Sequence, residues 1–431
     1  MNAQVSFLDG TLSLIHIPLD LYSTLLQPIL QILLPPSQDP SKQGTLEGLS
    51  LTDSGGSGGG HGFLNISVTP LECSIVCDSA WAESVFEPAI RKLPKAQART
   101  VAVSKDTYAA LSVYGAGMDA GSRVVELTSP LALANIPIFF ITTYYSDFIL
   151  VPVKDRQTVV KTLLAKGFVF SDDDQSHLVS ANPSPTSASH RHAFSFSSSH
   201  THSRVPSDDT TTPPSPPSSN VNDLQQRTFD LLKRRNVVPH IAPDLVLVQC
   251  TGIRGTGAQH NYHGHRLHHS HGHGHGHHNG GHHGNPSRGS NGGGGSRRGS
   301  RTHPCWVDTI DARLYTSVVA ALVAQPRFLS VTLAHEDPPS LLLDRELLGL
   351  FGESLVGPTE GALVPIFLDL ADLPFEATGI VSGVAGRLVR EMRMGEGSEL
   401  SYLATARSGA VVLSGEQAGV ALGVLMEAFG E

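Results

Sequence analysis

Two distant segments of the chain carry the same order of structural signals. The first copy has the pattern of a strand, a Gly-rich turn, a helix and two closely spaced strands (residues 107–113, 115–121, 122–135, 137–144 and 148–153). The second copy has a strand, a turn, a helix, two strands and a further helix (residues 364–369, 373–379, 380–392, 399–405, 410–414 and 416–429). This order makes up most of a βαββαβ unit, so the sequence predicts a tandem ferredoxin-like protein.

The Gly-rich turn has a second interpretation, which the following hairpin disfavours. Gly115, Gly117 and Gly121 lie between a strand and a helix, as do the phosphate-binding glycines of a dinucleotide fold. A dinucleotide fold needs parallel strands joined by helical crossovers. Between Ile141 and Ile149 there is room only for a tight turn, which joins antiparallel strands.

The remaining apolar segments fit two further units interrupted by insertions. One has strand and helix signals before and after a Gly-rich loop (residues 11–17, 18–34, 64–68, 73–76 and 81–92). The other resumes after a His-rich insertion (residues 245–250, 307–324, 327–334, 340–344 and 346–355). We therefore expect an α+β protein of four ferredoxin-like units. Long insertions are tolerated at loops because the entropy of closure grows only logarithmically with length.

Composition sets the expected domain boundaries. The predicted units span residues 1–96, 97–170, 241–360 and 361–431. Residues 36–62, 171–240 and 255–303 are Gly-rich, Ser/Pro-rich and His/Gly-rich, respectively, and lack the apolar residues that a core requires. We expect the first and third of these segments to be disordered insertions and the second to be a disordered linker.

Charge, cysteine content and hydropathy exclude several classes of protein. The formal net charge is −9 and no basic groove with interleaved aromatic residues is evident, which disfavours a nucleic-acid partner. Four scattered cysteines do not form a disulfide framework, and Cys73 and Cys77 fit a buried strand better than a zinc site. No segment offers the about 20 mostly apolar residues that span a bilayer. The sequence therefore predicts a cytoplasmic protein without a membrane span.

Catalytic and metal sites are not expected. The chain has no G-x-S-x-G nucleophile motif, and neither a cofactor nor a catalytic residue is assigned. The His-rich tract of residues 260–283 could ligate a transition metal, but repeated His-Gly offers no rigid ligand set. A passive linker is the preferred interpretation and a metal-handling protein the alternative, so no metal-binding residue is assigned.

Three segments resemble the CASTOR family of cytosolic amino-acid sensors, which are built from four ACT domains. Residues 141–151 (ITTYYSDFILV) are similar to a hairpin typical of that family, and residues 375–381 (FEATGIV) to the turn that enters the first helix of its fourth domain. Residues 11–34 resemble its opening strand and helix. The resemblance implies ACT units, no catalysis and an amino-acid pocket between the second and fourth units.

The resemblance also implies the residues of that pocket. They belong to the second and fourth units (Pro137, Ile138, Pro374, Phe375, Glu376, Ala377, Thr378, Gly379, Thr405 and Gly409). Ala377 and Gly409 stand where the arginine-binding pattern has acids, and Pro137 where it has a hydroxyl. A buried guanidinium needs carboxylate partners, so these replacements disfavour arginine and leave Glu376 as the carboxylate of the turn. Helix N-terminal N–H groups near Gly379 still suit the carboxylate of an amino acid.

These expectations define a regulatory function with one alternative. The leading hypothesis is a cytoplasmic amino-acid sensor whose ligand occupancy changes its binding to a protein partner. By resemblance, that partner is a GATOR-type complex in signalling to the TOR kinase, and a homodimer is compatible with the family. The alternative is the regulatory subunit of an amino-acid biosynthetic enzyme such as an aspartate-kinase-like assembly.

Overall fold

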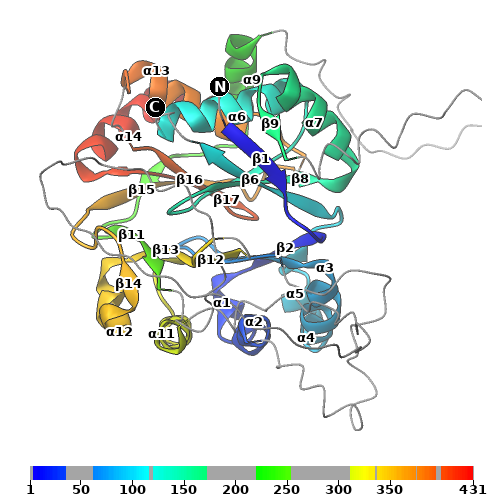
Figure 1. Ribbon diagram of the computed structural model, residues 1–431, viewed down its shortest axis with the longest axis vertical. Helices are drawn as coiled ribbons and strands as arrows, with labels where there is room; N and C mark the ends of the chain where they lie inside the picture. Colours follow the sequence, from blue (N-terminus) through cyan, green and yellow to red (C-terminus); the bar gives the residue numbers. More distant parts are fainter. Residues whose placement is uncertain are drawn as a thin grey trace, which may run out of the picture.

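The computed structural model describes residues 3–34, 62–115, 120–171, 220–253, 311–334, 337–374, 376–394 and 399–430. Strands occupy two layers in the middle of the molecule, and helices cover the outer side of each layer (Figure 1). A strand in this position is covered by helices on one face and by the other strand layer on its other face. Strands such as β3 (Phe63–Val68) and β12 (Leu329–Ala334) are accordingly buried at every residue, as expected for strands with two covered faces.

Four sets of elements, each beginning strand–helix–strand–strand, follow one another along the chain. The first set comprises β2 (Leu12–Ile17), α1 (Leu19–Tyr22), α2 (Leu26–Leu33), β3, β4 (Cys73–Asp78), α3 (Ser79–Trp81), η1 (Ala82–Phe86), α4 (Glu87–Arg91), α5 (Lys95–Ala98) and β5 (Ala102–Val103). The second comprises β6 (Tyr108–Gly115), α6 (Ala120–Leu133), β7 (Phe139–Thr142), β8 (Asp147–Pro152), η2 (Val153–Asp155), α7 (Arg156–Ala165) and β9 (Val169–Phe170).

The other two sets lie in the C-terminal half. The third comprises β11 (Leu247–Gly252), α11 (Ala312–Val323), β12, β13 (Ser340–Asp344), η3 (Arg345–Leu347), α12 (Leu348–Phe351), η4 (Gly352–Ser354) and β14 (Leu355–Val356). The fourth comprises β15 (Leu363–Asp369), α13 (Ile380–Glu391), β16 (Ser401–Ala404), β17 (Ser408–Ser414) and α14 (Gly415–Phe429). Among the described residues, three elements lie outside the sets: β1 (Ala3–Phe7), α9 (Val221–Arg234) and β10 (His240–Ile241).

Strand pairing joins the sets two by two. The second and fourth sets form the run β9–β1–β6–β8–β7–β16–β17–β15–β10. The first and third form the run β5–β2–β4–β3–β12–β13–β11–β14. Pairs between Leu12 and Tyr108 and between Leu247 and Leu363 connect the two runs into one closed network. The two hairpins that decided the sequence interpretation, β7–β8 and β16–β17, are antiparallel as predicted.

The core continues between the two strand layers. Phe63 of β3 packs against Phe148 of β8 with ring centroids 4.9 Å apart, and Phe328 lies 6.1 Å from Phe367 of β15. One large cluster of buried apolar residues includes side chains from both runs of strands. The relative placement of the layers is therefore fixed by apolar packing as well as by hydrogen bonds.

The structure corrects one boundary and leaves two insertions untested. Residues 171–240 were predicted to be a linker, but α9 lies within this range and β10 begins at its last residue. The helix forms because Leu224, Phe229 and Leu232 share one buried face, while Asn220 accepts a hydrogen bond from the Asp223 N–H at its N-terminus. Nearly all of the Gly-rich insertion and all of the His/Gly-rich insertion lie outside the described residues.

Candidate functional site

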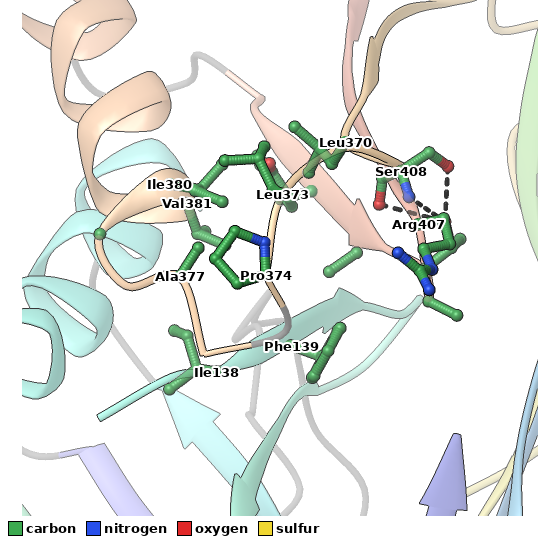
Figure 2. A pocket seen from close by; sticks show the side chains of 15 residues that line it. Ile138, Phe139, Leu370, Leu373, Pro374, Ala377, Ile380, Val381, Arg407 and Ser408 are labelled. Atoms are coloured by element: carbon green, nitrogen blue, oxygen red, sulfur yellow. Dashed lines mark hydrogen bonds between the residues drawn. The ribbon is translucent and has the colours of Figure 1, made fainter. Parts of the chain in front are cut away.

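A cavity of about 60 Å³ opens between the second and fourth sets. Its wall is built from the start of β7, the loop that precedes α13, the first turn of α13 and the β16–β17 turn (Figure 2). The described residues that line it are mostly apolar (Ile138, Phe139, Leu370, Leu373, Pro374, Ala377, Gly379, Ile380, Val381, Tyr402, Ala404, Thr405, Ala406, Arg407 and Ser408). The cavity thus lies between the two sets that correspond to the repeated pattern of the sequence.

The cavity occurs where the ladder between the two sets stops. The pairing of β7 with β16 consists of the single pair Ile141 and Leu403. Continuing that antiparallel register would place Phe139 opposite Thr405, but both of these residues line the cavity instead. Two strands that separate in this way leave space between main-chain segments, which a small polar ligand can occupy.

The N-terminus of α13 forms one side of the cavity. The helix begins after Gly379, whose φ of 84° is in the left-handed region that favours glycine. A Cβ atom at this position would also lie 2.8 Å from the hydroxyl oxygen of Thr228 in α9. The first N–H groups of a helix have no partner within the helix, and Gly379 has no side chain that could accept from them. Such a helix N-terminus suits an anion.

Tyr402 contributes a buried hydroxyl to the wall. Its side chain is 1% exposed, and its hydroxyl has no hydrogen-bond partner within the structure as described. Burial raises the pKa of Tyr402, which keeps the phenol neutral. Buried hydroxyl groups normally have a partner, so this group marks a place where a ligand or water completes the site.

Arg407 is the cationic residue among the described lining residues. Its Nη1 donates to the Ala371 carbonyl at 2.8 Å, and its carbonyl accepts from the Leu370 N–H at 2.9 Å. These bonds tie the β16–β17 turn to the loop that precedes α13. No carboxylate is among the described residues of the wall, so the site has positive and neutral groups but no acidic one.

The predicted pocket residues and the wall of this cavity overlap in part. Five of the predicted residues line the cavity (Ile138, Pro374, Ala377, Gly379 and Thr405). Pro137, Thr378 and Gly409 are not in the wall. Gly409 lies next to the Tyr402 hydroxyl, because a Cβ atom built on Gly409 would be 2.6 Å from that oxygen. Phe375 lies outside the described residues.

The structure places Glu376 at the surface, and its role toward a cationic ligand group stays a prediction. Its side chain is exposed and does not line the cavity. Its charge acts on the neighbouring second set. The pKa of Tyr108 is raised to about 12, mainly by burial and to a smaller extent by the negative charges of Asp106 and Glu376. A hydrogen bond from Lys154 to Asp106 at 2.6 Å is the largest cause of the raised pKa of Lys154, with Glu376 a smaller one.

Two residues of the wall, Tyr402 and Arg407, were not predicted. Tyr402 and Leu403 are neighbouring residues of a short strand. Large apolar side chains are common in strands, so Tyr402 carries no functional signal by itself. Arg407 follows the strand in a turn, where a charged residue is common. Its closeness to the loop before α13 could be found only from the register of β15 with β17, in which Leu368 opposes Gly409.

Other candidate chemistry is absent from the part of the chain that the structure covers. Cys73 and Cys77 are buried free thiols, and burial raises the pKa of both. No group of three or more His, Cys, Asp or Glu side chains is placed to hold a metal ion among the described residues. None of the helices described here combines the length and apolar character that crossing a bilayer requires.

The chain resembles several known proteins over part of its length. It is 32% identical over 109 residues to the human protein CASTOR3P, a match that spans 23% of this chain and 61% of that protein. A crystallised protein of Agobacterium tumefaciens aligns over 40% of this chain and 93% of its own, with 18% identity and a TM-score of 0.24. Aspartate kinase of Synechocystis aligns over 99% of this chain and 55% of its own, with 11% identity and a TM-score of 0.28. Residues 103–165, which include β6, α6, β7 and β8, match the ACT domain.

Proposed function

We propose that the chain is a regulatory protein of four ACT units that binds one small neutral L-amino acid in the cavity between the second and fourth units. The four units correspond to the four sets of elements, with the expected boundaries 1–96, 97–170, 241–360 and 361–431. The ACT match of residues 103–165 supports a role in amino-acid binding and regulation. The observation that carries the proposal is that Tyr402, whose buried hydroxyl has no partner among the described residues, lines the same cavity as the N-terminus of α13.

The wall offers the groups that the constant part of an amino acid requires. The first N–H groups of α13, at Ile380 and Val381, would take the ligand carboxylate, and the positive charge of Arg407 favours the same anion. The Tyr402 hydroxyl can accept a hydrogen bond from the ligand ammonium group. These two features lie on different elements of one unit, so they can hold both ends of the ligand.

The wall also limits the ligand side chain. A cationic side chain would be buried without a carboxylate partner, which carries a large free-energy penalty. A cavity of about 60 Å³ has room for about four to six water molecules, comparable with the few heavy atoms of a small amino acid. Ala377, Leu373 and Ile138 present apolar surface, so alanine, valine and leucine are better candidates than arginine.

Regulation rather than catalysis is the proposed output. We propose that the protein acts on a partner, a GATOR-type complex in cytoplasmic signalling to the TOR kinase, as the resemblance of residues 141–151 and 375–381 to the CASTOR family implies. Co-purification of that complex with the full chain, in the presence and absence of the bound amino acid, tests this part. An amount of complex that does not change with the ligand contradicts it.

A thermal-shift screen tests the proposed binding. Each of the common L-amino acids is added to the full chain, because a ligand that binds only the folded form raises the melting temperature. We expect a neutral aliphatic amino acid to give the largest shift. Ala377→Leu fills the cavity and should abolish the shift, whereas Ala371→Leu, an exposed position in the same loop, should not. No shift with any amino acid contradicts the proposal.

A further inference from the structure

Three hairpin turns in the described part of the chain share one hydrogen-bond pattern. They begin with Thr69, Thr143 and Thr405 and span four residues each, in the first, second and fourth sets. In each, the N–H of the first residue donates to the carbonyl of the fourth at 2.9 Å. The N–H of the fourth residue donates to the threonine hydroxyl at 3.1 or 3.2 Å. A threonine side chain thus closes each turn, as in other hydroxyl-stabilised turns.

The other strand run caps two of these turns. In the turn of residues 405–408, the Ala406 N–H donates to the Ser74 hydroxyl of β4 at 3.0 Å. In the turn of residues 143–146, the Tyr144 N–H donates to the Ser340 hydroxyl of β13 at 2.9 Å. The first set therefore caps a turn of the fourth set, and the third set caps a turn of the second. Of these two turns, only that of residues 405–408 lines the described cavity.

At the cavity turn a buried carboxylate adds two further bonds. Glu72, at the end of the β3–β4 turn, is 1% exposed. Its Oε1 accepts from the Thr405 hydroxyl at 2.5 Å and from the Arg407 N–H at 2.7 Å. Its Oε2 lies 2.6 Å from His16 Nδ1 of β2. Two bonds from residues 405 and 407 to one buried oxygen atom therefore hold the turn from the opposite layer.

We propose that Glu72 is a positioning residue for the ligand cavity and couples its occupancy to the β3–β4 hairpin of the first set. Glu72 is outside the wall, but the two residues that it holds, Thr405 and Arg407, are part of it. Because coupling between two sites is reciprocal, a ligand that orders the wall also strengthens the hold on Glu72. The inference rests on the proposed function for its statement that the wall serves a ligand.

The coupling extends to the joint between the first and third sets. β3 precedes the turn that carries Glu72 and pairs with β12 over six residue pairs, from Leu329 with Val68 to Ala334 with Phe63. A change at Glu72 therefore acts on the strand that connects these two sets. This route gives ligand binding in one strand layer a physical connection to the other layer.

Hydrogen exchange on the full chain without ligand tests the positioning role. Glu72→Ala should raise amide exchange in residues 404–409 at least tenfold, while Glu72→Gln, which still accepts two of the bonds, should change it less. Ser340→Ala is the matched control, because it removes the cap of the other turn and should affect residues 143–146 only. A purely structural role for Glu72 would raise exchange throughout both layers. Unchanged exchange in residues 404–409 overturns the inference.

Calorimetry with L-alanine, L-valine and L-leucine as probes tests the coupling. Glu72→Ala should weaken the binding of the preferred probe about tenfold, which corresponds to about 1.4 kcal/mol, and Ser340→Ala should leave it unchanged. If Glu72→Ala does not fold, Ser74→Ala loosens the same turn and replaces it. Raised exchange with unchanged affinity overturns the coupling. If the wild type binds no probe, the proposed function fails, and the exchange data still decide whether Glu72 positions the turn.

Discussion

A Cβ atom built on Gly409 lies 2.6 Å from the hydroxyl oxygen of Tyr402, closer than such atoms approach in folded proteins. Tyr402 opposes Val411 in the β16–β17 ladder, and Gly409 is two residues away on the same strand. The ring therefore lies diagonally over Gly409. Glycine at this position is required by the aromatic side chain, which occupies the space where a longer residue would stand.

Gly409→Ala should lower the free energy of unfolding by about 1–3 kcal/mol, because the added methyl group is forced against Tyr402. In the Tyr402→Phe background the cost should be smaller, since the nearest ring carbon is 3.3 Å away. Urea denaturation of the two single variants and the double variant measures this coupling. An equal cost in both backgrounds would show that the Tyr402 hydroxyl is not the obstacle.

Tyr402→Phe should leave the stability of the unliganded protein unchanged or raise it slightly. Its hydroxyl is buried without a partner in the described structure, so removing it relieves a desolvation cost. The same variant should weaken binding of the preferred amino acid by about 0.5–1.5 kcal/mol, the value of one hydrogen bond. Denaturation and calorimetry on the same samples separate the two effects. A large loss of stability would indicate an internal partner for the hydroxyl.

In the second set, the position that corresponds to Gly409 is Asp147, which belongs to a buried ion pair. Thr142 opposes Asp147 in β7–β8 as Ala404 opposes Gly409 in β16–β17. Asp147 is fully buried and pairs with Nε of Arg123 in α6. Arg123→Ala leaves this carboxylate without its cation and should lower the free energy of unfolding by about 3–5 kcal/mol. A cost below about 1 kcal/mol, typical of an exposed pair, would contradict this assignment.

Asp147 should also make stability depend on pH. Burial raises its pKa above the ordinary value of 3.8, although Arg123 acts in the opposite direction. A raised pKa in the folded state means that the contribution of Asp147 is fully present below 3.8 and is lost as the pH rises through the raised pKa. The stability of the wild type relative to Asp147→Asn should therefore decrease as the pH rises from 3.8 through the raised pKa of Asp147. Denaturation at a series of pH values measures it, and a difference that grows with pH has the wrong sign.

Helix α9 should contribute to the folded core. Leu232 is fully buried, so Leu232→Ala is expected to lower the free energy of unfolding by about 2–5 kcal/mol. Gln226→Ala, at an exposed position of the same helix, is the control and should have little effect. Thermal and chemical denaturation provide the comparison. A negligible cost for Leu232→Ala would restore the prediction that this segment is a linker.

The repeated hairpins were predictable because their signals are local. The short connection between β7 and β8 allows only an antiparallel pair, and apolar alternation locates the strands. Helix α9 was missed because the Ser/Pro-rich composition before it dominated the interpretation of its segment. Its one buried face, with Leu224, Phe229 and Leu232, is a signal that a shorter window would detect.

The candidate site was predictable only in part because its contacts are not local. Gly379 was implied by the family resemblance of residues 375–381, and it lies directly before α13. The roles of Glu72 and Tyr402 depend on partners brought close by the fold, and Glu72 and Thr405 are 333 positions apart. Glu376 was expected to be the carboxylate of the turn, but its side chain is exposed. The presence of a carboxylate in the sequence does not tell which way its side chain points.

Isothermal titration calorimetry of the full chain with alanine, valine, leucine and arginine tests the central claim most directly. The cavity has no carboxylate among its described residues, and in the second set the position that corresponds to Gly409 is Asp147, which pairs with Arg123. We therefore predict one site per chain, occupied by a neutral amino acid in preference to arginine, with binding lost in Ala377→Leu and retained in Ala371→Leu. Two sites per chain, a preference for arginine, or binding that persists in Ala377→Leu would contradict the account.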